Sequence, residues 1–311
     1  MTHPFQHILI TRMNVEWNIS RPVEERNNLD FLSYRFNIFE KTCFPSVNAQ
    51  SNKNFVWLLL LDSKLPDEFR KRVEQYTSTP QLIPVYIENK DTFLDQLKQA
   101  INTHLSASTT HLMTTNLDSD DAISKDFVAT IQEQFKGQDF EFINFPFGFM
   151  YRFVDEKLYL RDWLTAPCHT LIEQRDNFET ASNYKHDTIT KYKTRQIPTK
   201  PMWLMTVHGK NVRTKFDVNA AWQPTQRLTH DFDIRFDLPH TSYLKTLNEI
   251  FAAVITVITS QRDWDSPSVK FKKVANILSP AIMRSLRQAQ MVIQKLAHSF
   301  QKSSLKNTVV E

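Results

Sequence analysis

Three aspartates stand close together at the end of an apolar-rich run, because Asp118, Asp120 and Asp121 directly follow His111–Leu117. Carboxylates this close repel one another unless a positive group lies between them, and divalent cations bound together with substrate phosphates are the usual partners. The alternative is an N-cap for a helix that starts at Ala122, but capping needs one acid and not three. The cluster therefore predicts a site for a divalent cation, Mn²⁺ or Mg²⁺, or for phosphate.

Strands and helices that alternate along the chain must position these acids. The apolar spacing predicts strands over His7–Thr11, Phe55–Leu61, Leu82–Ile87 and His111–Leu117, and helices over Leu29–Cys43, Asp67–Tyr76, Thr92–Leu105 and Ala122–Phe135. This order is typical of an α/β fold with a mostly parallel sheet. Ligands of such sheets bind beyond the carboxyl ends of the strands, where Asp62 and the three aspartates fall.

The second half of the chain is less regular. We expect a strand pair at Phe140–Phe145 and Phe149–Tyr159, followed by a polar and irregular substrate-side segment at His169–Lys200. A further apolar strand at Met202–Val207 runs directly into His208. Two helices follow at Leu244–Thr259 and Val269–Phe300, the second broken at Pro280. We divide the chain into an α/β domain over 1–240 and a basic helical extension over 241–311.

Composition excludes several classes of protein. Three glycines are too few for a glycine-rich phosphate loop, and neither phosphate-loop motif occurs. Two cysteines, Cys43 and Cys168, form no disulfide framework or zinc array and indicate a reducing compartment. The N-terminus lacks a signal pattern, and the apolar runs are too short to cross a bilayer. We therefore expect a cytoplasmic protein.

The C-terminal segment is basic. Residues 266–310 contain eight Lys and Arg and no acid: Lys270, Lys272, Lys273, Arg284, Arg287, Lys295, Lys302 and Lys306. A solvated helical face is the default interpretation. Peripheral contact with the inner face of the cell membrane is the other, with an apolar side formed by Phe271, Ile277, Leu278, Leu286, Val292, Ile293, Leu296 and Phe300. No nucleic-acid-binding module accompanies the charge, so nucleic acid is not expected as a partner.

Known carboxylate motifs narrow the chemistry of the cluster. An EF-hand starting at Asp118 would need Gly and Glu where Ile123 and Ala129 stand. A phosphatase of the haloacid-dehalogenase type would need Thr or Val at Ala122. The Asp-x-Asp motif of nucleotide-sugar transferases fits better, since one or two carboxylates suffice to hold a cation that stabilises a diphosphate leaving group.

Several short segments carry a resemblance to a known family. They are Ile10-Thr11-Arg12, Pro45-Ser46 with Gln50, Phe55-Val56-Trp57 running to Asp62, Leu117–Ala122, Pro201-Met202-Trp203 and His208-Gly209-Lys210-Asn211. Together they resemble GT-A glycosyltransferases, and more closely the bacterial proteins grouped as rhamnosyltransferases, over about residues 5–240. The resemblance implies a GT-A-like fold, a nucleotide-sugar donor and a saccharide or lipid-linked saccharide acceptor in polysaccharide or glycan synthesis.

The resemblance also implies roles for individual residues. Asp118 and Asp120 would hold the cation, with Asp121 in support and His208 as a further ligand. Asp62, Arg12 and Asp118 would bind the nucleotide and its phosphates. One position departs from the family pattern, which has Arg where this chain has Asn116, and Asn cannot supply that charge.

An inverting reaction needs a general base to deprotonate the acceptor hydroxyl. The candidates are Glu173, which follows a short apolar pair and is expected to point into the cleft, and Asp187 of the His186-Asp187 pair. Two other functions stay open. One is a metal-dependent phosphate-ester hydrolase that uses the same acids, and the other is a non-catalytic nucleotide-sugar-binding protein.

Overall fold

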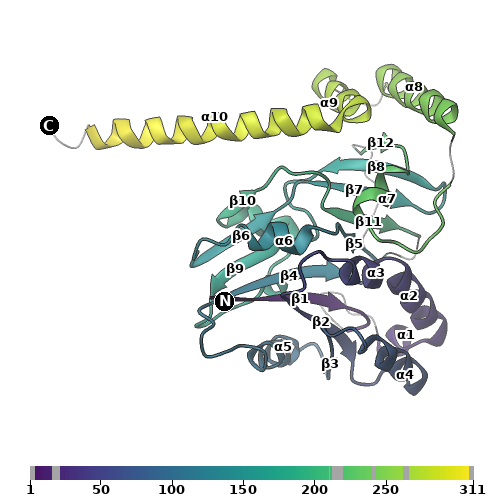
Figure 1. Cartoon of the computed structure of the whole chain (residues 1–311), viewed down its shortest axis with the longest axis vertical. Helices are drawn as coiled ribbons and strands as arrows, with labels where there is room; N and C mark the ends of the chain where they lie inside the picture. The colour runs from purple at the N-terminus through teal and green to yellow at the C-terminus, as the bar shows by residue number, and fades with distance from the viewer. Residues whose placement is uncertain are drawn as a thin grey trace.

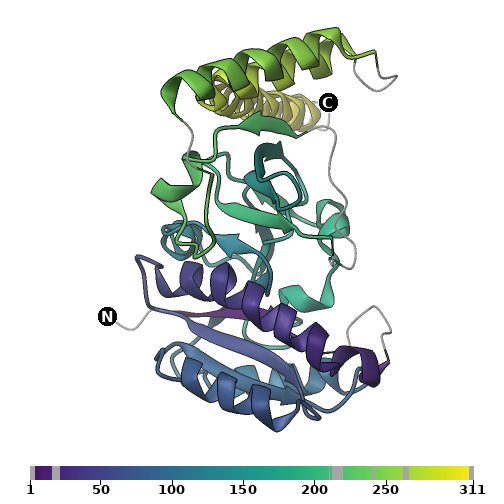
Figure 2. The same ribbon diagram turned by 90° about the vertical axis from the view of Figure 1, so that its right-hand side faces the viewer.

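The computed structural model describes residues 4–15, 22–209, 211, 220–239, 242–261 and 266–307, with only the backbone described from 294 onward. In these parts the chain forms two β-sheets with helices packed around them, and three further helices lie together at one end (Figures 1 and 2). One hydrophobic core cluster contains residues of both sheets, among them Leu9 and Leu59 of the first and Ile123, Met150 and Trp203 of the second.

The first sheet has seven strands in the order β10-β6-β9-β4-β1-β2-β3. Their bounds are β1 Phe5–Arg12, β2 Val56–Asp62, β3 Leu82–Ile87, β4 His111–Asp118, β6 Phe140–Asn144, β9 Thr170–Gln174 and β10 Thr194–Gln196. The pairs among β1, β2, β3 and β4 are all parallel, whereas β9 runs antiparallel to both of its neighbours. The expected α/β fold with a mostly parallel central sheet and C-terminal helices is confirmed.

Helices cover both faces of this sheet. They are α1 Val23–Arg26, α2 Leu29–Lys41, α3 Cys43–Asn48, α4 Asp67–Tyr76, α5 Phe93–Asn102 and α6 Phe127–Gln132. Because side chains alternate along a strand, Leu9 and Leu59 pack in the cluster that includes α2 and α4, whereas Ile8 and Leu58 pack against α5. The parallel strands are thus buried on both faces, as their continuous apolar sequences predict.

The second sheet has five strands in the order β12-β8-β7-β11-β5. Their bounds are β5 Ala122–Ile123, β7 Phe147–Arg152, β8 Lys157–Asp162, β11 Trp203–Val207 and β12 Ala221–Gln223. The predicted pairing of the strand at Phe140 with the following one is wrong, since β6 belongs to the first sheet and β7 pairs with β8. Gly148 lets β7 approach Trp203, because a Cβ there would lie 2.0 Å from the indole.

Two further sequence predictions need correction. The helix expected from Ala122 starts later, at Phe127, because Ala122 and Ile123 instead pair with Leu204 and Trp203 of β11. The segment His169–Lys200 is not irregular throughout. It contains strands β9 and β10 and two short 3-10 helices, η1 Ala181–Asn183 and η2 His186–Lys191.

The C-terminal part consists of α8 Tyr243–Thr259, α9 Pro267–Leu278 and α10 Pro280–Asn307, preceded by the short α7 Arg227–Asp231. The predicted break at Pro280 is confirmed, since α9 ends at Leu278 and α10 starts at Pro280. Within the described residues, none of the helices combines the length and the apolar character needed to cross a membrane. The domain boundary at 240 stays a prediction.

Candidate active site

Arg12 and Asp118 face each other at the carboxyl ends of two neighbouring parallel strands. They are register partners at the last positions of β1 and β4, and Arg12 Nη2 lies 3.0 Å from Asp118 Oδ1. The side chains are 28% and 47% exposed, so this ion pair borders solvent. Two residues predicted to contact the donor therefore lie together at the edge where ligands of parallel sheets bind.

Asp120 and Asp121 lie in the tight turn that follows β4, and both are buried. The turn is closed by a hydrogen bond from the Asp121 N–H to the Asp118 carbonyl at 3.1 Å. Strand β11 fixes both acids through Thr206, whose N–H donates to Asp121 Oδ1 at 2.9 Å and whose hydroxyl donates to the Asp120 carbonyl at 2.6 Å. The first and second sheets thus meet at the acids.

The two buried acids have opposite electrostatic environments. Burial alone would raise the pKa of Asp120, but the hydrogen bond with His208 and the positive charge of Arg35 hold that pKa below its usual value. Burial and the nearby charges of Asp120 and Asp118 raise the pKa of Asp121 well above its usual value. Like charges in one buried site cannot both ionise freely, so Asp120 carries the charge and Asp121 favours the protonated form.

His208, which follows β11, lies against the acids as predicted from its position. Its Nε2 lies 3.0 Å from Asp120 Oδ2, and its side chain is 3% exposed. Asn211 donates to the same carboxylate oxygen at 3.3 Å, and the ring of Tyr34 lies 5.2 Å from the imidazole. Lys210, which belongs to the same motif, lies outside the described residues.

Helix α2 supplies a cation that the sequence analysis did not identify. Arg35 Nη2 donates to the Ser119 hydroxyl at 2.5 Å, and its charge acts on both Asp120 and Asp121. The sequence carries no signal for this role, because Arg35 is one of several charged residues on an amphipathic helix. Only the packing of α2 over the turn brings it to the acids.

Asp62 ends β2 at the same edge of the sheet, and its partners were not predicted. Arg26 Nη2 lies 3.0 Å from Asp62 Oδ2, and both side chains are almost fully buried. The N–H of Lys64 donates to the other carboxylate oxygen at 2.8 Å, and Asn14 accepts from the N–H of Asp62 at 3.0 Å. Asp62 therefore holds the chain at the end of β2, and contact with a base stays a prediction.

The structure does not bring Glu173 to the acids, and the prediction that it points into the cleft is wrong. Glu173 is the register partner of Leu112 near the start of β4. At about 3.3 Å per residue this places it about 20 Å from Asp118. Its buried carboxylate accepts the N–H groups of Glu179 and Thr180 at 2.8 and 2.9 Å.

The other candidate base lies on the surface. Asp187 is an exposed residue of η2. Its neighbour His186 is held by the Thr165 carbonyl, 2.9 Å from Nδ1. Asn116, the departure from the family pattern, is buried and accepts a hydrogen bond from the Ser182 hydroxyl at 2.6 Å. The position therefore fixes η1 to β4, and the positive charge beside Asp118 comes from Arg12 instead.

The donor set fits a cation only if a ligand completes the coordination. Among the described residues, no three His, Cys, Asp or Glu side chains converge closely enough to hold a metal ion. Magnesium and manganese are commonly held by one or two carboxylates together with substrate phosphates. The half-exposed Asp118 and the ionised Asp120 fit that arrangement, and His208 Nδ1 is buried without a partner among the described residues.

Comparison with known families decides the class of protein. Residues 16–219 match the model of the family described as "Putative rhamnosyl transferase". The chain belongs to this family of glycosyltransferases. The match contains Asp62, Asp118, Asp120, Asp121 and His208. The assignment from short motifs is therefore confirmed, and the chain is a glycosyltransferase.

Comparison with solved structures gives distant likenesses. The chain is similar to TarS 1-349 of S. aureus, with 12% identity, a TM-score of 0.36 and coverage of 88% of this chain and 70% of that one. For the structure of TarS 1-349 in complex with UDP, the identity is 14%, the TM-score is 0.37, and the match covers 88% of this chain and 70% of that one. For HddC from Yersinia pseudotuberculosis, the identity is 11%, the TM-score is 0.31, and the match covers 65% of this chain and 90% of that one. No curated protein matches the chain.

Proposed function

We propose that this glycosyltransferase moves a sugar, with rhamnose as the first candidate, from a nucleotide-sugar donor to a saccharide or lipid-linked saccharide acceptor, and that the transfer needs Mn²⁺ or Mg²⁺. One observation carries the proposal. Arg12, Asp118, Asp120 and His208 come from three distant parts of the chain and meet at the carboxyl edge of the parallel strands.

The charges at this edge suit a diphosphate. Asp118 and Asp120 would hold the cation, with Asp121 in support and His208 beside them. When bound, the cation would neutralise charge that develops on the diphosphate leaving group. Arg12 pairs with Asp118 but is itself 28% exposed, so its other N–H groups can donate to a phosphate oxygen from the solvent side.

The general base is assigned by accessibility. Glu173 is buried about 20 Å from Asp118 and is withdrawn as a candidate. Asp187 is exposed to solvent, so it is the remaining proposal. This role applies only to an inverting reaction.

The first experiment is a thermal-shift screen of nucleoside diphosphates and nucleotide sugars, each with and without Mn²⁺. A ligand that binds only the folded protein raises the melting temperature by mass action. Stabilisation by one nucleotide that is lost in EDTA supports the metal-dependent donor site. Stabilisation that is equal in EDTA would remove the metal from the proposal.

A second measurement separates transfer from its rivals. The nucleotide that stabilises the protein is supplied as its sugar conjugate together with saccharide acceptors, and the products are analysed by mass spectrometry. Acceptor that gains one sugar supports transfer. Phosphate release from simple esters without acceptor would indicate the hydrolase, and binding without any product would indicate the non-catalytic protein.

A further inference from the structure

Helix α8 presents its large apolar side chains to solvent. None of its residues is buried. Five of its large apolar side chains are between 42% and 73% exposed: Leu244, Leu247, Phe251, Ile255 and Ile258. Their spacing of three and four residues places them on one face of the helix, which we call the α8 stripe. A helix of a globular domain normally turns such a face toward the core.

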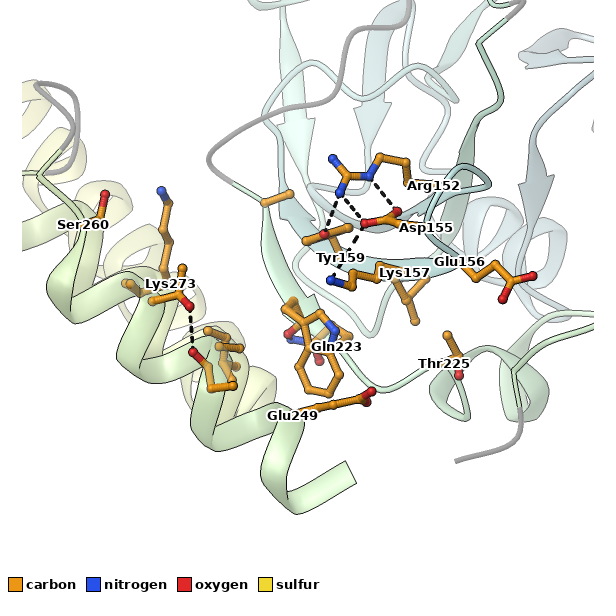
Figure 3. A pocket seen from close by; sticks show the side chains of 18 of the residues that line it. Arg152, Asp155, Glu156, Lys157, Tyr159, Gln223, Thr225, Glu249, Ser260 and Lys273 are labelled. Carbon is orange, nitrogen blue, oxygen red and sulfur yellow. Dashed lines mark hydrogen bonds and ion pairs between the residues drawn. The ribbon is translucent and has the colours of Figure 1, made fainter. Parts of the chain in front are cut away.

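The opposite face of α8 is polar or small and lines a cavity of about 930 Å³. Lys245, Glu249, Ala252 and Thr256 follow the same three- and four-residue spacing, offset from the stripe. Figure 3 shows Glu249 extending from α8 toward the strand that carries Gln223. The side of α8 that lines the cavity, where Val257 is the largest apolar residue, is therefore less apolar than the stripe, whose side chains stay 42–73% exposed.

Basic residues follow this stripe along the chain, on α9 and α10. Helix α9 packs against α8, and α10 packs against α9 and runs away from α8 (Figure 1). Residues 266–310 contain no acid. Lys270 donates to the carbonyls of Ile258 and Ser260 at 3.0 and 2.6 Å and so fixes α9 to the end of α8. Exposed Phe271 and Lys272 then follow on α9.

Some of the basic residues serve the protein itself. Lys273 is buried, and Arg287 forms an ion pair with Asp162. The side chains of Lys295, Lys302, Lys306, Leu296 and Phe300 lie in the part of α10 whose side chains are not described. The exposed apolar side chains continue on the described part of α10 at Ile282, Leu286, Val292 and Ile293.

We propose that the end of the molecule formed by α8, α9 and α10 docks on the surface of an anionic lipid bilayer. The α8 stripe enters the interface, and the basic side chains of α9 and α10 lie near the headgroups. Charge complementarity favours this occupant over a second copy of the chain, because two copies would bring two acid-free basic segments together. The inference makes no use of the proposed catalytic role.

The test is co-sedimentation of the full chain with vesicles. One set contains phosphatidylcholine alone, and the other contains phosphatidylcholine with phosphatidylglycerol. We expect binding to the anionic vesicles that weakens with salt. The double substitution F251Q/I255Q removes two stripe side chains and should weaken binding about tenfold or more. Thr256→Gln, on the cavity face of the same helix, is the matched control and should bind like the parent.

Three results would overturn the proposal. They are no binding to either vesicle, unchanged binding of F251Q/I255Q, and a parent dimer that F251Q/I255Q dissociates while neither protein binds vesicles. The last result would identify a second copy as the occupant. L244Q/I258Q is an independent stripe variant in case the first double variant does not fold. Vesicle binding is measured without substrates, so its result can be interpreted even if the protein does not transfer a sugar.

Discussion

Asp120 and His208 are 88 positions apart in the chain, yet Nε2 of His208 lies 3.0 Å from Oδ2 of Asp120. This contact supplies the first prediction. Asp120→Asn should lower the transfer rate about a hundredfold or more, because the ionised carboxylate at the centre of the site is lost. The fold should stay intact, but the melting temperature should fall somewhat, because the lowered pKa of Asp120 means that its ionised form favours the folded state.

The control for this variant is Asp126→Asn, an acid outside the cluster whose carboxylate lies 2.6 Å from Lys200 Nζ. It should keep full transfer activity. Both rates are measured with the same donor and acceptor by product formation. Activity of Asp120→Asn within a few-fold of the parent would sink the assignment of the site.

Arg12 gives a prediction about binding of the donor. Arg12→Gln should weaken the affinity for the nucleoside diphosphate about tenfold, because hydrogen bonds to charged groups contribute about 1.5–3 kcal/mol. Stability should change by less than about 1 kcal/mol, since the pair with Asp118 is solvent-exposed. Calorimetric titration measures the affinity. The affinity of Arg12→Lys, which keeps the charge, should lie between those of the parent and Arg12→Gln. Unchanged affinity in Arg12→Gln would exclude a phosphate contact.

The ion pair between Arg26 and Asp62 gives a prediction about stability. Removing Arg26 leaves the buried Asp62 carboxylate without its cation, and breaking a buried pair in this way typically costs about 3–5 kcal/mol. Arg26→Met and Asp62→Asn should each lower the urea midpoint clearly, and the double variant should lose less than the sum. Asp67→Asn, in an exposed acid, serves as the control and should change little. Additive losses would show that the two charges do not interact.

Glu173 gives a prediction about pH. Burial raises its pKa to about 7 from the usual 4.5. The folded protein therefore holds a proton between these values that the unfolded chain has released, so this group lowers stability as pH rises from 4.5 to about 7. The effect is on the order of 3 kcal/mol and is constant above that range.

Glu173→Gln should remove this contribution. The difference in unfolding free energy between variant and parent is measured by urea titration at about pH 5 and about pH 8, and it should shift in favour of the variant at the higher pH. Glu68→Gln changes an exposed carboxylate on α4, which does not contribute to the electrostatics of Glu173, and it should show no comparable shift. A pH-independent difference for Glu173→Gln would contradict the prediction.

The local sequence was sufficient for the elements that lead to the site. Helix α4 at Asp67–Tyr76 and strand β3 at Leu82–Ile87 occur at the predicted bounds. Their apolar spacing and their flanking residues carry enough information, because packing only reinforces what the local pattern favours.

Long-range contacts explain what could not be predicted. Ala122 reads as the start of a helix, but pairing with β11 makes it a strand. Glu173 follows a short apolar pair in a segment predicted to be irregular. Instead β9 pairs with β4 in the first sheet, and this places Glu173 at the end of the sheet opposite the acids. Arg35 and Arg26 become site residues only through the packing of α2 and α1. No periodicity in the sequence encodes such contacts. The acids, Arg12 and His208 could be predicted from spacing and resemblance, whereas Arg35 and Arg26 could not.

The turn between Asp118 and Ala122 connects the two sheets of the molecule. Strand β4 ends at Asp118 in one sheet, and β5 begins at Ala122 in the other. A ligand that binds Asp118 and Asp120 together therefore also stabilises the contact between the two sheets. Linkage is reciprocal, so a substitution that loosens β5 from β11 should reduce ligand affinity without touching the ligand. A saturating ligand should in turn delay separation of the sheets.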